Sequence, residues 1–343
     1  MDKDAPYVYM RIRSVGQELC RFSGCQGKVA GRKVPDRCTN LLLPFGSFCP
    51  SIVRRARPAK SEGESRVTNK TLSTEGIRRG WEIAAPAYRE GFALALQEIS
   101  HELARRLPSR LPTPVLDLAC GPGTAMATLE QYHGPILSVG CDFSHAMVGF
   151  ARKTTGGGHG VVADQDLLPF APATFGTVVS SMGTIFSREP ERQLGTIATI
   201  LKTGGCYGFS AWGEPHENAM GAVSRRVVDS WPYSLSSAPP PIETPYSQGQ
   251  SPWLSRATEK AGLSIVSVTS HWLVFRFPDR GAAARALAGT GRLALLTGGA
   301  PAREQELLDR LMEAFLPHED RASGQVELAN RYHLFVLSRS SGQ

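Results

Sequence analysis

Three aspartates stand at the ends of short apolar runs, where together they could build a nucleoside site. Asp117 lies inside "LDLACGPGT" (116–124), Asp142 closes "ILSVGCD" (136–142) and Asp164 closes "GVVAD" (160–164). A carboxylate at the end of a strand can accept hydrogen bonds from both hydroxyls of a ribose. Each aspartate alone is typical of a helix cap or a turn, so it is the joint pattern that favours a binding site.

Gly121 and Gly123 predict that the backbone of the first of these turns passes very close to a ligand. Glycine permits both the approach and a positive φ, and the helix that follows points its free N–H groups at the ligand. A phosphate-binding P-loop requires a lysine that this turn lacks, and a dinucleotide fingerprint requires a small residue where Met126 stands. The glycines alone also fit a structural corner between strand and helix.

The hydrophobic pattern around these turns alternates between buried strands and helices, which predicts an α/β fold with a mainly parallel sheet. Ligands of such sheets bind at the carboxyl ends of the strands. We expect strands at 114–119, 136–142, 160–164, 175–181 and 205–212, and helices at 124–132, 144–153 and 189–202.

Segments before and after this core are expected to cover the site. Residues 74–107 have helical apolar spacing, with a break expected near Pro86. The later chain predicts a helix at 213–231, a Pro- and Ser-rich loop at 232–252, a helix at 253–261, a strand at 263–277, helices at 280–296 and 302–316, and a last strand at 331–340.

The N-terminal segment differs from the rest in charge. Residues 1–60 hold 12 Lys and Arg against 4 Asp and Glu, a net charge of +8, whereas residues 61–343 hold 26 against 27. We expect a basic, flexible arm over 1–72 and one domain over 73–343. The nearly neutral domain weighs against a nucleic-acid groove. The cysteine spacing in the arm has no CxxC pair, so no metal site is expected.

Four segments, taken in order, resemble successive motifs of class I S-adenosylmethionine-dependent methyltransferases. They are "VLDLACGPGT" (115–124), "GCDFSHAMVGFAR" (140–152), "VVADQDLLPFAPATFGTVVSS" (161–181) and "ILKTGGCYGFSAW" (200–212). The composition and order of these segments are most similar to those of the branch that includes the ubiquinone and menaquinone biosynthesis methyltransferases. The resemblance implies a Rossmann-like seven-stranded sheet with an antiparallel last strand, helices on both faces, and helical lid insertions, here at about 213–252 and 280–316.

Residue by residue, the resemblance implies a cofactor site for S-adenosyl-L-methionine. Asp117 would orient the turn, Asp142 would hold the ribose, and Trp81 with Tyr88 would resemble the segment that lids the cofactor. The other implied binding residues are Ala119, Gly121, Gly123, Phe143, Met147, Asp164, Gln165 and Ser181. Thr184, Ile185 and Phe186 stand where quinone-modifying members often carry a histidine, which puts a quinone substrate in doubt.

The implied activity is methylation of a small, apolar or aromatic molecule of specialised or cofactor metabolism. His216 is the candidate general base, although an exposed histidine at a helix start is the ordinary alternative. We expect aromatic residues of the lid insertions near the acceptor, namely Trp212, Trp231, Trp253, Trp272, Tyr233 and Tyr246.

Three other functions stay open. An RNA or protein methyltransferase could use the basic arm, and a non-catalytic scaffold could bind the cofactor without turnover. A nicotinamide dehydrogenase fits less well, because the third glycine is missing. With no apolar run long enough to span a bilayer, we expect a cytoplasmic protein. Arg11, Arg13 and Arg21 leave a mitochondrial address as the alternative. A homodimer is also left open.

Overall fold

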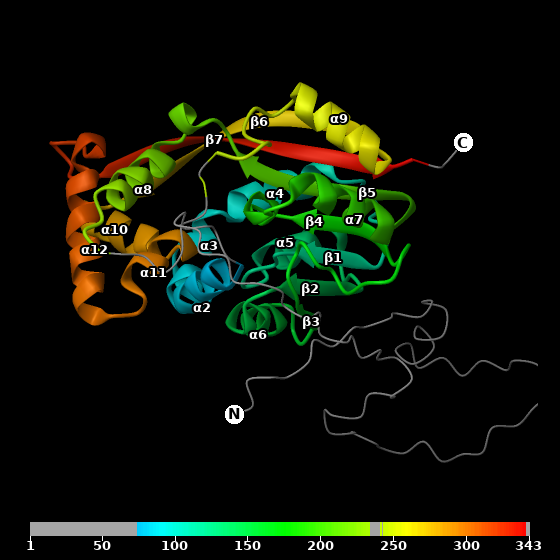
Figure 1. The fold of residues 1–343 in the computed structure, drawn as a ribbon, viewed down its shortest axis with the longest axis horizontal. Coiled ribbons are helices and arrows are strands. Elements are labelled where there is room, and N and C mark those ends of the chain that lie inside the picture. The colour runs from blue at the N-terminus through cyan, green and yellow to red at the C-terminus, as the bar shows by residue number, and fades with distance from the viewer. Residues whose placement is uncertain (1–73, 234–240, 242, 341–343) are drawn as a thin grey trace, which may run out of the picture. The chain divides into compact units, whose positions relative to one another are not determined.

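The computed structural model describes residues 74–233, 241 and 243–340 of the 343-residue chain. The basic arm expected over 1–72 lies outside the described residues. Apart from Pro169–Ala171, the described residues belong to one compact unit, and the fold below is the fold of that unit (Figure 1). None of its described helices combines the length and the apolar character needed to cross a bilayer.

A seven-stranded sheet with the order β3-β2-β1-β4-β5-β7-β6 forms the centre of this unit. The first five strands along the chain are parallel, and β7 runs antiparallel to both of its neighbours. The predicted Rossmann-like sheet with an antiparallel last strand is therefore confirmed. The strands are β1 (Val115–Leu118), β2 (Ser138–Asp142), β3 (His159–Val162), β4 (Phe175–Ser180), β5 (Leu201–Trp212), β6 (Leu263–Phe277) and β7 (Val326–Arg339).

Strand β5 shows how the sheet is covered on both faces. Side chains alternate along a strand, so Gly208 and its neighbours point in opposite directions. Gly208 faces Leu103 and Leu107, and a Cβ at this glycine would lie 2.6 Å from Leu107. Phe209 points to the other face, where its ring stacks on Phe335 at 4.4 Å between centroids. The absent side chain at Gly208 thus lets a helix approach one face closely.

The helices beside the parallel strands follow the predicted alternation. Helix α4 packs with α5 on the Gly208 face of the sheet, α6 packs beside β2 and β3, and α7 packs with α9. The bounds are α4 (Gln97–Arg106), α5 (Thr124–His133), α6 (His145–Thr154), α7 (Pro190–Ile200) and α9 (Pro252–Ala261).

A second group of helices lies away from α9: α8 packs on β7 and α10 on β6, and the other members pack on these helices or on one another (Figure 1). With Trp212, Leu273 and Tyr332 from the sheet it forms a separate apolar cluster. Its members are α2 (Thr74–Glu90), α3 (Phe92–Ala95), α8 (Ala219–Asp229), α10 (Arg280–Ala288), α11 (Gly291–Thr297) and α12 (Pro301–Ala314).

The expected break near Pro86 is wrong, because α2 continues through this proline to Glu90. The chain leaves the helical region at Gly91 instead, where φ is −122° and ψ is −86°. Helix α2 packs along α11, and a Cβ at Gly80 would lie 2.3 Å from the carbonyl oxygen of Gly291. This close packing holds the helix across the hydrogen bond that proline cannot make.

Further boundaries differ from the sequence prediction, among them two beside the lid and the sheet edge. The helix expected at 280–296 is divided at Gly289 and Thr290, where Thr290 has the extended values φ −91° and ψ 145°. The division turns Gly291 against the ring of Trp81. The last strand begins at Val326 rather than at 331, because it pairs with β6 along its whole length, up to Phe277.

Candidate functional site

A cavity of about 540 Å³ lies at the carboxyl ends of β1, β2 and β4, and we call it the strand-end cavity. This is the edge at which parallel sheets bind their ligands. Eight of the eleven predicted cofactor-binding residues line it, together with six others. The lining residues are Trp81, Tyr88, Ala119, Gly121, Cys141, Asp142, Phe143, Met147, Ala163, Gln165, Ser181, Met182, Gly183 and Phe186.

Three predicted residues stand outside this lining. Asp117 is buried within β1, and Gly123 is the N-cap of α5 with a φ of 87°. Asp164 faces Arg188, whose Nη2 donates to its carboxylate at 2.9 Å, and not the cavity. The neighbouring Gln165 lines the cavity and donates from Nε2 to the Gly183 carbonyl at 3.2 Å.

The turn after β1 has left-handed backbone at three positions. Ala119 has a φ of 52°, Gly121 of 51° and Gly123 of 87°. A non-glycine residue in this region is uncommon, so Ala119 carries local strain at the edge of the cavity. A Cβ at Gly183, in the turn after β4, would lie 2.5 Å from the Ala119 Cβ. The turns after β1 and β4 are thus in contact, and glycine is required for that contact.

The carboxylate of Asp142 is tied into these turns by the backbone. Its Oδ2 accepts from the Gly121 N–H at 3.0 Å and its Oδ1 from the Ser144 N–H at 2.9 Å. Burial raises the pKa of Asp142 to about 6, against the lowering effect of these N–H donors. Burial, with the charge of Asp142, likewise raises the pKa of Asp117 to about 7. Two buried carboxyls therefore titrate near neutral pH behind and beside the cavity.

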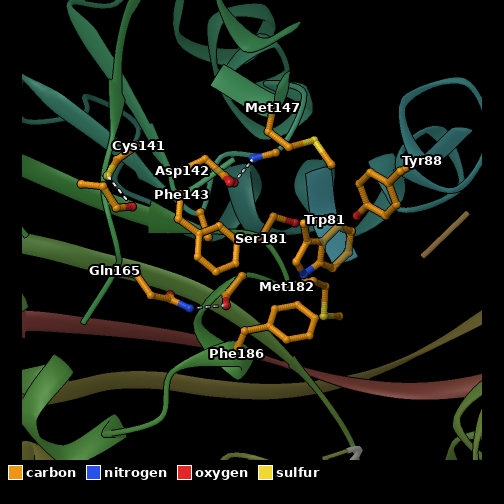
Figure 2. Close-up of a pocket in the computed structure, with 14 residues that line it drawn as sticks. Trp81, Tyr88, Cys141, Asp142, Phe143, Met147, Gln165, Ser181, Met182 and Phe186 are labelled. Carbon is orange, nitrogen blue, oxygen red and sulfur yellow. Dashed lines mark hydrogen bonds between the residues drawn. The ribbon is translucent and has the colours of Figure 1, made fainter. Parts of the chain in front are cut away.

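An aromatic wall formed by Trp81, Tyr88 and Phe186 closes one side of the strand-end cavity. The Trp81 ring meets Tyr88 edge to face at 5.0 Å and Phe186 at 5.4 Å. Figure 2 shows Trp81 and Tyr88 across the cavity from Phe143 and Asp142, with Phe186 and Met182 at its lower edge. Helix α2 thus supplies a lid to a site that is otherwise built by strand ends.

A second cavity, which we call the helical cavity, lies on the other side of this wall, and its space, part of which is open to solvent, is about 720 Å³. It shares Trp81, Tyr88, Met182 and Phe186 with the strand-end cavity, so the two are neighbours. Its remaining lining is mostly apolar, with a few polar groups: Phe92, Leu96, Ile185, Trp212, Asn218, Met220, Gly221, Ser224, Pro241, Leu287, Thr290 and Arg292.

Only part of the aromatic set expected over the acceptor is there. Trp212 lines the helical cavity, but Tyr246 packs edge to face on Phe209, on the opposite face of β5 from α4, and Trp253 packs on Tyr246. Trp272 is 57% exposed on the edge strand β6. The expectation is therefore wrong for Tyr246 and Trp253, which cover the other face of β5, and for Trp272, which is exposed on the edge strand. Trp231 and Tyr233 are not among the described residues that line either cavity.

His216 lies in a single 3₁₀ turn (Pro215–Glu217), and its side chain is 73% exposed. Its Nδ1 lies 3.4 Å from the Glu214 carboxylate, and His216 is not among the described residues that line either cavity. The position agrees with an exposed histidine at a helix start. A role as general base stays a prediction without a contact to support it.

Glu82 fixes the lid helix α2 to the start of α6, and sequence reasoning missed it. Its carboxylate accepts from the Ser144 hydroxyl at 2.6 Å and from the Ala146 N–H at 3.3 Å. Negative charge at a helix N-terminus is stabilising, and Ser144 is itself the N-cap of α6. One glutamate thus links the lid to the strand end that carries Asp142.

We expect Glu82→Ala to lower the free energy of unfolding by about 1 kcal/mol, since two hydrogen bonds to a helix start are lost. The matched control is Glu90→Ala, which removes a surface pair with Arg89 worth about 0–0.5 kcal/mol. Urea unfolding of both variants measures the difference. Equal losses in the two variants would show that Glu82 does not hold the lid.

Phe186, Gly183 and Arg292 were also missed as lining residues. Phe186 follows β4 in the segment where the sequence departs from the quinone-modifying pattern, which was the available signal. Arg292 is one charged residue within the apolar stretch "GRLALL" (291–296). Among the described residues no cluster of His, Cys, Asp and Glu could hold a metal ion, and Cys120, Cys141 and Cys206 are buried and unpaired.

The chain is similar to known methyltransferases in sequence. Residues 115–205 match the family model described as "Methyltransferase domain". A malonyl-[acyl-carrier protein] O-methyltransferase of Herminiimonas arsenicoxydans is 33% identical over 147 residues, which are 41% of this chain and 55% of that protein. A demethylmenaquinone methyltransferase of Thermobifida fusca is 35% identical over 96 residues, 26% of this chain and 40% of that protein.

The chain spans about half the length of the curated relatives that it matches. Among solved structures, the YcgJ protein of Bacillus subtilis aligns over 71% of this chain and 100% of its own, with a TM-score of 0.49 and 14% identity. Residues 115–205 are thus identified as a methyltransferase domain, and the sheet around them has the strand order that the resemblance to class I S-adenosylmethionine-dependent methyltransferases implies.

Proposed function

We propose that the protein transfers a methyl group from S-adenosylmethionine, held in the strand-end cavity, to a small, largely apolar molecule held in the helical cavity. The observation that carries this proposal is the shared wall. Trp81, Tyr88, Met182 and Phe186 line both cavities, so a donor in one and an acceptor in the other would meet there.

The residues of the strand-end cavity fit the proposed donor. A carboxylate at the end of β2 suits ribose hydroxyls, and the rings and thioethers of Phe143 and Met147 suit a purine. Gly121 has a φ of 51°, and a Cβ there would meet only Tyr88, at 4.0 Å, so its backbone is open to close approach. The polar and apolar groups match a nucleoside without phosphates.

When bound, S-adenosylmethionine supplies an electrophilic methyl group on a sulfonium. The chain's own contribution is to position and to exclude water, which together can account for most of the acceleration of a displacement. The half-buried Ser181 and the buried Met182, directly after β4, would border the reacting atoms, and Trp81 with Tyr88 would keep water out. Met182 is held with a φ of 58° by its N–H, which donates to the Ser210 hydroxyl at 2.8 Å.

Labelled methyl donor tests the proposal directly. We expect purified full-length protein to transfer label to an apolar or aromatic small molecule in a screen of acceptors with hydroxyl, amine, thiol and carbon nucleophiles. Filling the helical cavity with Ser224→Trp should abolish transfer and leave donor binding unchanged. Transfer to bulk RNA or protein instead, undiminished by Ser224→Trp, would favour the alternative that depends on the basic arm.

Donor affinity should depend on pH through Asp142. The pKa of this carboxyl is raised to about 6, so its ionised form is lost as the pH falls below that value. The Kd for S-adenosylhomocysteine should rise about tenfold from pH 7.5 to pH 5, since roughly one carboxyl in eleven is ionised at the lower pH. Asp117 titrates nearby, so calorimetry on Asp142→Asn is the control. If the Kd of this variant depended on pH as steeply as that of the wild type, the pH dependence would belong to Asp117.

A further inference from the structure

The helical cavity contains hydrogen-bond donors that the protein itself does not satisfy. The Nε and Nη1 atoms of Arg292, the Nδ2 atom of Asn218 and the hydroxyl of Ser224 are buried, and none has a hydrogen-bond partner among the described residues. All three residues line this one cavity. Asn218 is 1% exposed and Ser224 is 5% exposed, so bulk water does not satisfy them.

Arg292 is the costly member of this set. Arg292 is partly exposed as a residue, but two of its guanidinium nitrogens are buried without a partner, so they lose hydration and gain no hydrogen bond in return, which native proteins rarely tolerate. Burial, assisted by the nearby charge of Arg225, lowers the pKa of Arg292 to about 10, while Asp229 opposes the shift. Arg292 therefore remains a cation at neutral pH. Unsatisfied buried groups of this kind are typical of sites whose partner is a ligand.

The other residues that line the helical cavity indicate the chemistry of such a ligand. The rings of Phe92, Phe186 and Trp212 and the side chains of Leu96 and Leu287 supply apolar walls. The unsatisfied Arg292 and Asn218 atoms are donors, so they seek oxygen acceptors rather than N–H groups. An arginine fork binds a carboxylate with two parallel hydrogen bonds, which gives both affinity and orientation.

We propose that the methyl acceptor is an apolar molecule with a carboxylate, and that Arg292 binds this carboxylate. The apolar part of the acceptor would then lie against the aromatic wall, next to the donor. Naming this ligand as the methyl acceptor rests on the function proposed above. Arg292 is thus a specificity-determining residue, and Asn218 and Ser224 are its candidate polar helpers.

Two probes with the same ring system test the proposal by calorimetry: 2-naphthoate, and the neutral 2-naphthamide. The wild-type protein should bind the carboxylate at least tenfold more tightly than the amide, since a charge-assisted pair is lost. Arg292→Met should reduce this preference to about twofold or less. The matched control is Arg225→Met, which removes a nearby but exposed cation and should keep the preference.

Thermal melting supplies a second readout. Arg292→Met should raise the melting temperature of the ligand-free protein by roughly 2–4 °C, because two buried guanidinium N–H groups without partners are removed. Naphthoate should stabilise the wild type and not the variant. Arg292→Gln is measured beside it as a second variant. The proposal is overturned if the wild type shows no preference for the carboxylate, or if Arg292→Met keeps that preference. It is also overturned if the Arg292 variants, and not Arg225→Met, melt at a lower temperature than the wild type.

The same titrations are repeated with saturating S-adenosylhomocysteine, so that this inference and the proposed function can fail separately. Naphthoate selectivity without any binding of S-adenosylhomocysteine would leave the carboxylate site standing and contradict a methyltransferase. Binding of S-adenosylhomocysteine without naphthoate selectivity would leave the donor site standing and overturn the role of Arg292.

Discussion

Asp142→Ala is expected to raise the Kd for S-adenosylhomocysteine by about 10- to 150-fold. The loss of charge-assisted hydrogen bonds to two ribose hydroxyls corresponds to about 1.5–3 kcal/mol. Asp142 accepts from the Gly121 and Ser144 N–H groups, which hold the carboxylate at the cavity. Isothermal titration calorimetry at pH 7.5 measures the change. An unchanged Kd would place the ribose elsewhere.

The stability of the ligand-free Asp142 variants shows whether weaker binding results from a damaged fold or from a lost contact with the ligand. The pKa of the Asp142 carboxyl is higher in the folded chain, about 6 against 3.8, so folding favours its protonated form. Its contribution to stability is therefore present at low pH and falls as the pH rises through that window. At pH 8, Asp142→Asn removes a buried charge, but its amide oxygen replaces only one of the two oxygens that accept from the Gly121 and Ser144 N–H groups, so the free energy of unfolding should fall by no more than about 1 kcal/mol. A large loss there would mean that Asp142 holds the turns together.

Gly123→Ala is expected to lower the free energy of unfolding by about 2–4 kcal/mol. A non-glycine residue in left-handed backbone costs about 1 kcal/mol, and forced overlap in a packed region costs about 1–3 kcal/mol more. Gly123 has a φ of 87°, and a Cβ there would lie 2.9 Å from the Ala151 Cα in α6. Helices α5 and α6 would have to separate beside the strand-end cavity.

The matched control for this variant is Gly262→Ala. Gly262, the C-cap of α9, has a φ of 74°, but a Cβ there would meet nothing within 4 Å. This variant should cost only the strain of the left-handed backbone, about 1 kcal/mol. Chemical denaturation of the two variants isolates the steric effect. Equal losses would show that the contact with α6 does not require glycine.

The centre of the sheet was predictable from sequence because β1, β2, β4 and most of β5 are buried and read as continuous apolar runs. The turns at Gly121 and the acid at Asp142 were predictable because chemistry of that kind needs defined residue types at strand ends. The sequence prediction was less accurate where tertiary packing overrides local preference. Pro86 stays within α2 because α2 is packed along α11, and this contact joins segments about 200 residues apart.

The helical cavity was only partly predictable for the same physical reason. Trp212 could be placed near it, but Trp253 and Tyr246 could not be excluded without knowing which face of β5 each element covers. Arg292 and Glu82 gain their significance from partners, or missing partners, on other elements. A linear pattern holds no record of such contacts.

The most direct test of the central claim is a calorimetric titration of the full-length wild-type protein with S-adenosylmethionine and S-adenosylhomocysteine at two temperatures. If the strand-end cavity holds the methyl donor, both compounds bind with one-to-one stoichiometry and a Kd in the micromolar range, and Asp142→Ala weakens both. The absence of heat with either compound at both temperatures would contradict the assignment of the cavity and with it the proposed function.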